Sequence, residues 1–217
     1  MTARLRIAIM ISGTGSNMLA IHEACRSGRL AADIIGVLSD KSEAPGLAKA
    51  RDRGLHVEAI PVQAGEDRRA HGDRLLQALK VLQPQVVVLA GYMRILSDEF
   101  VNALADRLLN IHPSLLPKYK GLHTHRRVLE AGDAVHGATV HYVTPDLDCG
   151  PPVLQARLKV QPGETEESLI ARIHRAEHVI YPTVLGWLAE GRLQCIGGVP
   201  MLDGQKLEAP IVQDFAW

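Results

Sequence analysis

Val86 to Ala90 form an unbroken apolar run, and this run restricts the possible folds more than any other part of the sequence. A strand built from it has no polar residue at alternate positions, so both of its faces need apolar cover. Leu108, Leu109 and Ile111 resemble a second, shorter strand of the same kind. Helices on both faces of a parallel sheet give such cover. We therefore predict an α/β protein.

Strand and helix patterns alternate along the first half of the chain, which favours parallel strands joined by right-handed helical crossovers. The predicted strands are 5–11, 34–38, 57–60 and 85–90, and the predicted helices are 17–27, 47–53, 68–82 and a short one from Asp98. The expected architecture is a Rossmann-like, mostly parallel twisted sheet flanked by helices.

The second half changes pattern. Residues 138–143 and 153–160 alternate apolar with polar side chains, which predicts half-buried antiparallel strands. A long amphipathic helix is expected from Thr165 toward Glu190, with Pro182 bending or breaking it. Residues 191–217 contain two glycine turns and are predicted to form a small C-terminal hairpin appendage. With 217 residues, we expect one domain.

Composition excludes several classes of protein. The 24 basic and 24 acidic residues give a formal net charge of +0, which argues against a nucleic-acid partner. No apolar run is long enough to cross a membrane. The N-terminus enters Ile7–Ile11 without a cleavage signal, so we expect a cytoplasmic protein. The three cysteines have no metal-binding or disulfide spacing.

The loop Ser12–Asn17 follows the first predicted strand and contains Gly13 and Gly15. Such a turn lets the backbone approach a ligand, and the next helix offers free N–H groups, so the loop predicts a phosphate site. The alternative is a tight turn in which Ser16 or Asn17 only caps the helix. Met18 stands where a dinucleotide-binding motif needs its third glycine, and Asp40 is therefore interpreted as a turn or cap residue rather than a ribose ligand.

A second polar segment, Asn110–Pro117, leaves the run 108–111. Asn110 and His112 are alternate residues, so in extended backbone both side chains point at one small volume. His112 suits acid–base chemistry, although a lone histidine beside prolines is more often a hydrogen-bonded structural residue. His123 and His125 match no standard zinc spacing with it, and we predict no metal. Residues 91–96 either pack in the core or line an apolar slot for a flat heterocycle.

These segments resemble the folate-dependent phosphoribosylglycinamide formyltransferases of purine synthesis, and the resemblance covers nearly the whole chain. The motifs that carry it are Ile11–Asn17, Leu89–Leu96, Asn110–Tyr119 and Leu147–Pro151. The resemblance implies transfer of a formyl group from 10-formyltetrahydrofolate, a co-substrate, to the amine of glycinamide ribonucleotide, with no metal. It divides the domain into a nucleotide- and phosphate-binding half, 1–110, and a folate-binding and catalytic half, 111–190.

The same resemblance assigns roles to single residues. It implies that Asn110 stabilises the oxyanion, His112 is the catalytic acid and Asp148 is the carboxylate that favours the charged form of the histidine. The ribonucleotide-binding residues it implies are Gly15, Ser16, Asn17 and Glu177. The folate-binding residues it implies are Arg68, Met93, Arg94, Ile95, Leu96 and Asn110.

Two positions depart from the family pattern. Cys149 replaces a usual glycine and could restrict the loop that bears Asp148, whereas Lys120 replaces a common proline.

The nearest alternatives are a 10-formyltetrahydrofolate hydrolase and a methionyl-tRNA formyltransferase, but the chain has no room for the extra domain of either. A nicotinamide oxidoreductase and a non-enzymatic folate or nucleotide sensor share the architecture. The expected assembly is a monomer or homodimer.

Overall fold

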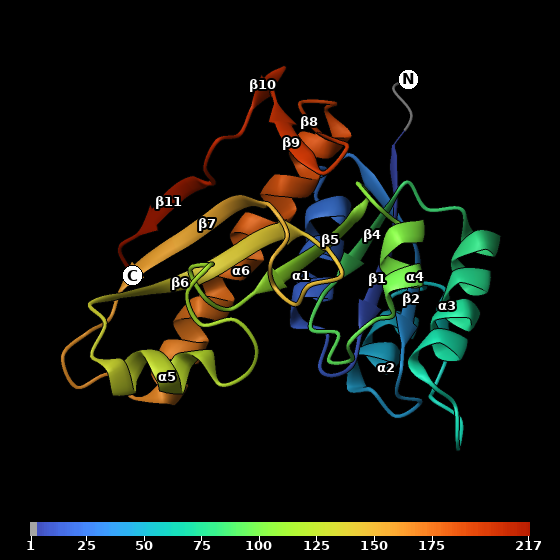
Figure 1. Cartoon of the computed structure of the whole chain (residues 1–217), viewed down its shortest axis with the longest axis horizontal. Coiled ribbons are helices and arrows are strands. Elements are labelled where there is room, and N and C mark those ends of the chain that lie inside the picture. Colours follow the sequence, from blue (N-terminus) through green and yellow to red (C-terminus); the bar gives the residue numbers. More distant parts are fainter. Residues whose placement is uncertain (1–3) are drawn as a thin grey trace.

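The computed structural model describes residues 4–217, and the first three residues of the N-terminal segment used above lie outside it. One eight-stranded sheet crosses the molecule in the order β11-β7-β6-β5-β4-β1-β2-β3 (Figure 1). Its strands are β1 (Leu5–Ile11), β2 (Ala32–Ser39), β3 (Val57–Ala59), β4 (Val86–Leu89), β5 (Leu108–His112), β6 (Val135–Tyr142), β7 (Pro152–Lys159) and β11 (Ile211–Phe215). The helices are α1 (Ser16–Arg26), α2 (Pro45–Arg51), α3 (Arg68–Leu82), α4 (Asp98–Ala103), α5 (Thr124–Ala131) and α6 (Glu166–Ala189).

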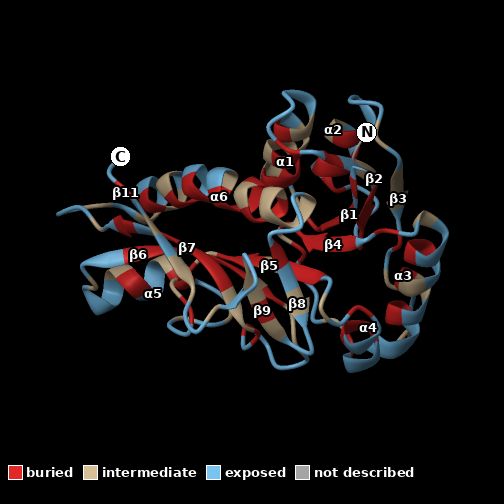
Figure 2. Ribbon diagram, turned by 90° about the horizontal axis from the view of Figure 1, so that it is seen from above, coloured by how far each residue is buried: buried red, intermediate tan, exposed pale blue. Residues whose placement is uncertain are grey.

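The centre of the sheet is buried on both faces, as the apolar runs predict. Ile7, Ile9 and Ile11 of β1 pack in one core with α1, α2 and α6. Ala8 and Met10 face the other way, into a second core with α3 and α4. Figure 2 shows these helices as two layers with the buried strands between them. The mostly parallel α/β architecture is therefore confirmed.

The sheet changes direction at β5, also as predicted. β5 is parallel to β4, whereas β6 is antiparallel to both β5 and β7. The register places Asn110 opposite His141 and His112 opposite Thr139. Side chains from β5 and β6 can therefore meet beyond the parallel half of the sheet.

Helix α6 is not broken at Pro182, which was one of the two expected outcomes, because it continues without interruption from Glu166 to Ala189. Ile180, Tyr181, Val184 and Leu185 are all fully buried around the proline. Their packing outweighs the roughly 3 kcal/mol that an interior proline costs a helix. Within residues 4–217, none of the helices is both long enough and apolar enough to cross a membrane.

The C-terminal tail is only partly the predicted appendage. β8 (Leu193–Ile196), β9 (Val199–Leu202) and β10 (Gln205–Lys206) form a separate antiparallel sheet, which contains the expected turns. β11 instead joins the large sheet, parallel to β7. Buried Phe215 packs in the core there, which explains why the last strand leaves the hairpin.

Tyr181 connects α6 to the strands that lead to the site. Its buried hydroxyl lies 3.0 Å from Leu89 O, at the end of β4, and 3.1 Å from Leu109 O, near the start of β5. We expect Tyr181→Phe to lower the free energy of unfolding by about 1–2 kcal/mol, because buried carbonyl groups lose a donor. Urea denaturation measures this change.

Tyr142→Phe is the matched control for that measurement. The Tyr142 hydroxyl is equally buried but has no hydrogen-bond partner within the described chain. We expect its removal to be neutral or slightly stabilising. Equal destabilisation by the two variants would contradict the role given to Tyr181.

Candidate functional site

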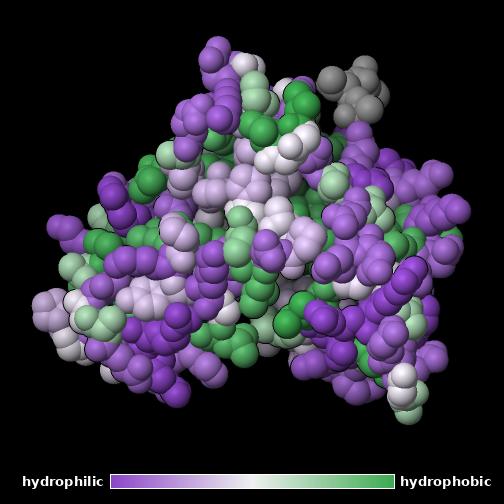
Figure 3. Space-filling view, viewed as in Figure 1, coloured by the Kyte–Doolittle hydropathy of each residue, from purple (hydrophilic) through white to green (hydrophobic). Residues whose placement is uncertain are grey.

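The carboxyl ends of β1, β4 and β5 lie side by side, so the loops that leave them meet at one edge of the sheet. In open α/β sheets this edge is where ligands bind. A cavity of about 520 Å³ opens here, lined from residues 89–96, 110–113, 121–125 and 141–148. Figure 3 shows the molecule hollowed between its two halves, with hydrophobic side chains gathered along the margin.

Asn110 and His141 form the first polar contact of the cavity. Tyr142 O lies 2.9 Å from His141 Nδ1 and can only accept, so Nδ1 carries the proton. His141 Nε2 then accepts from Asn110 Nδ2 at 3.2 Å. Burial lowers the pKa of His141 to about 4, which keeps the ring neutral. The second N–H of the Asn110 amide remains available to a ligand.

His112 lies beside this pair, with oxygen atoms near both ring nitrogens. Its Nε2 donates to Tyr119 O at 2.9 Å, and its Nδ1 lies 3.4 Å from Asp148 Oδ2. Both side chains are buried. A doubly protonated imidazolium satisfies both acceptors, and the same carboxylate accepts from Gly121 N–H at 2.9 Å. Asp148 therefore holds a histidine and a second loop together.

Cys149 does not restrict this loop in the expected way. The left-handed residue is Asp148, with φ +51°, and position 149 does not have a positive φ. The thiol is exposed and accepts from Lys120 Nζ at 2.9 Å. The two departures from the family pattern thus contact each other, one residue away from the Gly121–Asp148 contact.

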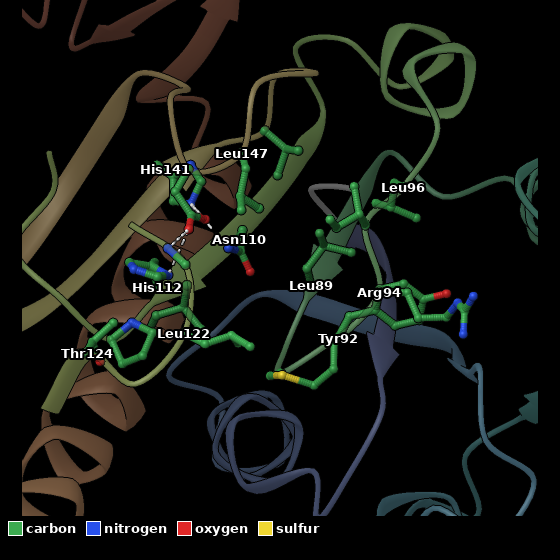
Figure 4. A pocket seen from close by; sticks show the side chains of 18 of the residues that line it. Leu89, Tyr92, Arg94, Leu96, Asn110, His112, Leu122, Thr124, His141 and Leu147 are labelled. Atoms are coloured by element: carbon green, nitrogen blue, oxygen red, sulfur yellow. Dashed lines mark hydrogen bonds and ion pairs between the residues drawn. The ribbon is translucent and has the colours of Figure 1, made fainter. Parts of the chain in front are cut away.

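The opposite wall of the cavity is apolar. Met93 and Ile95 have exposed fractions of 66% and 55% and line a slot, whereas Tyr92 of the same segment is buried in the second core and Leu96 packs against that core. Figure 4 shows Tyr92, Arg94 and Leu96 across the cavity from the polar residues of β5 and β6. Leu122 and Leu147, 70% and 54% exposed, add apolar surface from two other loops.

The glycine loop after β1 leaves the N-terminus of α1 open. Gly15 is the N-cap residue with φ +71°, and no side chain caps the helix. The capping alternative for Ser16 and Asn17 is therefore wrong. Asn17 instead donates from Nδ2 to Glu177 Oε2 at 2.8 Å, and both residues are buried. Free N–H groups and a positive helix end make this loop suitable for a phosphate.

Seven of the predicted site residues line the cavity: Met93, Arg94, Ile95, Leu96, Asn110, His112 and Asp148. Gly15, Ser16, Asn17 and Glu177 do not line it and instead lie together at the start of α1, and Arg68 belongs to neither group. It is exposed at the start of α3 and is not part of the cavity lining. His141 was missed by sequence reasoning, because only the register of β6 places it opposite Asn110. Asp40 was misinterpreted: it is buried and accepts from Ser12 Oγ, so it joins the ends of β2 and β1 rather than capping a turn.

The remaining histidines do not assemble a metal centre. His123 and His125 line the cavity, and His125 Nδ1 lies 3.1 Å from His136 Nε2. Across residues 4–217 there is no group of three or more His, Cys, Asp or Glu side chains arranged to hold a metal ion.

Comparisons with known proteins agree with this site. The model of the formyl transferase family matches residues 5–185. Phosphoribosylglycinamide formyltransferase of Escherichia coli is 47% identical over 203 residues, which cover 94% of this chain and 96% of that protein. The structure of phosphoribosylglycinamide formyltransferase from Coxiella burnetii has a TM-score of 0.91 at 43% identity and covers 96% of this chain and 99% of that chain.

A more distant neighbour has a different activity. Formyltetrahydrofolate deformylase from Burkholderia mallei superposes with a TM-score of 0.84 at 28% identity, over 93% of this chain and 70% of that one. The chain belongs to the formyl transferase family. Within it, the relatives that match nearly end to end are phosphoribosylglycinamide formyltransferases, so the chain is a transferase of that group whose co-substrate is a folate.

The neutral state of His141 can be measured. Because burial lowers its pKa to about 4, its imidazole C–H resonance should not move between pH 5.5 and 8.5. The measurement is an NMR titration, with the signal assigned by its loss in His141→Gln. The protein in urea is the control, since unfolded imidazoles titrate near 6.5. A native midpoint between 6 and 7 would contradict the neutral acceptor.

Proposed function

We propose that the chain transfers the formyl group of 10-formyltetrahydrofolate to the primary amine of glycinamide ribonucleotide, a step of purine synthesis. The observation that carries this proposal is the placement of Asn110, His112 and Asp148 in a cavity with one apolar wall, beside a free helix N-terminus. A flat folate and a small phosphorylated amine are substrates that such a divided site can hold together.

The ribonucleotide occupies the α1 side of the site. Gly15, Ser16 and Asn17 receive its phosphate at the start of the helix. Glu177, held by Asn17, supplies a carboxylate acceptor for the sugar or amide portion. Lys49 Nζ reaches Thr14 O at 3.1 Å and so brings a positive charge to the same loop. The amine then extends toward the carboxyl end of β5.

The folate occupies the apolar slot. Met93, Arg94, Ile95 and Leu96 form the wall against its pterin ring, and free backbone groups of this segment bind the ring edge. Asn110, which lies across the cavity from this wall in Figure 4, contacts the folate from the other side. Arg68 is assigned to the folate as well, and its exposed position suits a distal acidic part of the molecule rather than the pterin.

The polar wall then carries the reaction. As the amine attacks the formyl carbon, negative charge develops on the formyl oxygen and positive charge on the nitrogen. Asn110 donates its free N–H to that oxygen, and charged His112 adds a second donor. For this donation His112 Nε2 exchanges Tyr119 O for substrate, while Asp148, 3.4 Å from Nδ1, keeps the ring oriented. As the bond from the formyl carbon to the folate nitrogen breaks, that nitrogen gains a proton, which balances the proton that the amine loses.

The proposal is tested by measuring folate product with 10-formyltetrahydrofolate, with and without glycinamide ribonucleotide. We expect turnover only when the ribonucleotide is present. Equal turnover without it would identify a deformylase, which shares the fold. Binding of both substrates without turnover would identify a sensor protein. Either result would overturn the assignment.

The roles of His112 and Asp148 predict a specific loss of turnover. We expect His112→Ala and Asp148→Asn to lower kcat by about a hundred-fold or more, because each weakens stabilisation of charge that exists only in the transition state. Cys149→Ala is the matched control from the same loop, and its activity should stay near normal. A low rate in Cys149→Ala would indicate a thiol nucleophile, and a decrease below three-fold in the other variants would refute their roles.

Glu177 predicts a pH dependence of ribonucleotide binding. Burial raises the pKa of its carboxyl group to about 7, although the hydrogen bond from Asn17 opposes the shift. The group is therefore protonated below pH 7 and becomes a stronger, charged acceptor above it. We expect the Kd for the ribonucleotide to fall several-fold from pH 6 to pH 8, measured by calorimetry.

The phosphate of the ribonucleotide also titrates near pH 6, so the comparison with Glu177→Gln is essential. That variant keeps the phosphate contribution but loses the carboxylate. The difference between the two curves should have its midpoint near pH 7. Parallel curves would show that Glu177 does not face the ribonucleotide.

A further inference from the structure

Segment 91–96 has very few backbone hydrogen bonds. Within the described chain it makes two, and both go to one residue, Ser12 in the loop after β1. Ser12 N–H donates to Gly91 O at 3.1 Å, and Met93 N–H donates to Ser12 Oγ at 2.8 Å. The other backbone groups of the segment are free for a ligand. Tyr92 and Leu96 pack against the second core, so side-chain packing also holds the segment, but both of its backbone hydrogen bonds depend on a single serine.

Asp40 fixes the direction of the Ser12 hydroxyl. The carboxylate can only accept, so Ser12 must donate its proton to Asp40 Oδ1 and turn a lone pair to Met93 N–H. Ser12 and Asp40 are buried, with exposed fractions of 4% and 7%. A buried, charge-assisted hydrogen bond orients a hydroxyl more strongly than a bond to water does. The result is a one-way chain from Asp40 through Ser12 to Met93.

The glycine loop, in contrast, has anchors besides Ser12. Gly46 N–H donates to Gly13 O at 2.9 Å, at a contact so close that a Cβ on Gly46 would lie 2.5 Å from Ile11 Cδ1. Lys49 bonds Thr14 O, and Asn17 bonds Glu177. Loss of the Ser12 hydroxyl therefore leaves this loop held, but it removes the hydrogen bond that holds the backbone of the wall at Met93.

We propose that Ser12, oriented by Asp40, is a positioning residue that holds segment 91–96 in place for the folate. This inference rests on the proposed function, since it assigns the segment to that substrate. Neither Ser12 nor Asp40 contacts a reacting atom in the proposed formyl transfer. Their effect passes through the backbone of Met93, and it falls on one substrate rather than on both.

The first test compares the kinetics of Ser12→Ala with those of the wild type. We expect the KM for 10-formyltetrahydrofolate to rise about ten-fold, the effect of one lost buried hydrogen bond. The KM for the ribonucleotide and kcat should change by less than about three-fold. Ser39→Ala is the matched control: this buried serine bonds Lys41 N–H, one residue from Asp40, and does not contact the wall.

The second test observes the wall itself, without substrates. The Met93 amide should exchange its hydrogen slowly in the wild type and in Ser39→Ala, and quickly in Ser12→Ala. Asp40→Asn keeps an acceptor oxygen and should retain most of the protection. Asp40→Leu leaves the hydroxyl unoriented and should lose protection and folate affinity together. If Ser12→Ala does not fold, the comparison of Asp40→Asn with Asp40→Leu decides whether the Ser12 hydroxyl holds the wall.

The outcomes distinguish the positioning role of Ser12 from the proposed function of the chain. Loss of Met93 protection with an unchanged folate KM would confirm the contact but refute the folate assignment of the wall. Unchanged protection, or an equal rise of both KM values, would overturn the role of Ser12 whatever the substrate. Activity that does not depend on the ribonucleotide would instead refute the proposed function and leave the exchange result intact.

Discussion

Burial of β1 and β4 on both faces is the constraint on which the other features depend. Apart from Arg6 near the start of β1, these strands have no polar side chains, so the polar groups that can do chemistry collect where the strands end. β1, β4 and β5 are parallel neighbours and end at the same edge. The glycine loop, segment 91–96 and the Asn110–His112 pair therefore meet there by topology. The place of the site is therefore set by the burial of both faces of the central strands.

The direction change at β5 adds what a fully parallel sheet lacks. Because β6 runs antiparallel to β5, His141 faces Asn110 across the pair, and the chain returns near the site at Asp148. Thr139 fixes the loop after β5 from the same strand, since its hydroxyl donates to Ser114 O and accepts from Leu116 N–H. The polar wall is thus built mainly on the paired strands β5 and β6, whereas the apolar wall is the loop segment 91–96.

Sequence patterns predicted the elements whose own residues decide them. The continuous runs gave β1 and β4, the helical spacing of leucines gave α3 at its observed bounds, and the alternation gave β6 and β7. Contacts that depend on strand register or on loop packing could not be predicted from the sequence. Neither His141 beside Asn110 nor Tyr119 O beside His112 has a sequence signal, because partners 31 and 7 residues apart meet only in the folded chain. Pro182 and β11 show the same limit of local patterns. Burial of the neighbouring side chains keeps α6 continuous at a proline, and burial of Phe215 takes β11 out of the predicted hairpin.

The unequal hydrogen bonding of the two walls has a functional reason. A pterin ring presents donors and acceptors along its edge, and backbone groups already paired within a sheet cannot bind them. Segment 91–96 leaves most of its groups unpaired and so cannot hold itself in place by secondary structure. A buried serine fixed by a carboxylate gives the segment one position while occupying only two of its backbone groups. The wall remains available to substrate because its support comes from the neighbouring loop, and the glycine loop keeps its place because it has supports of its own.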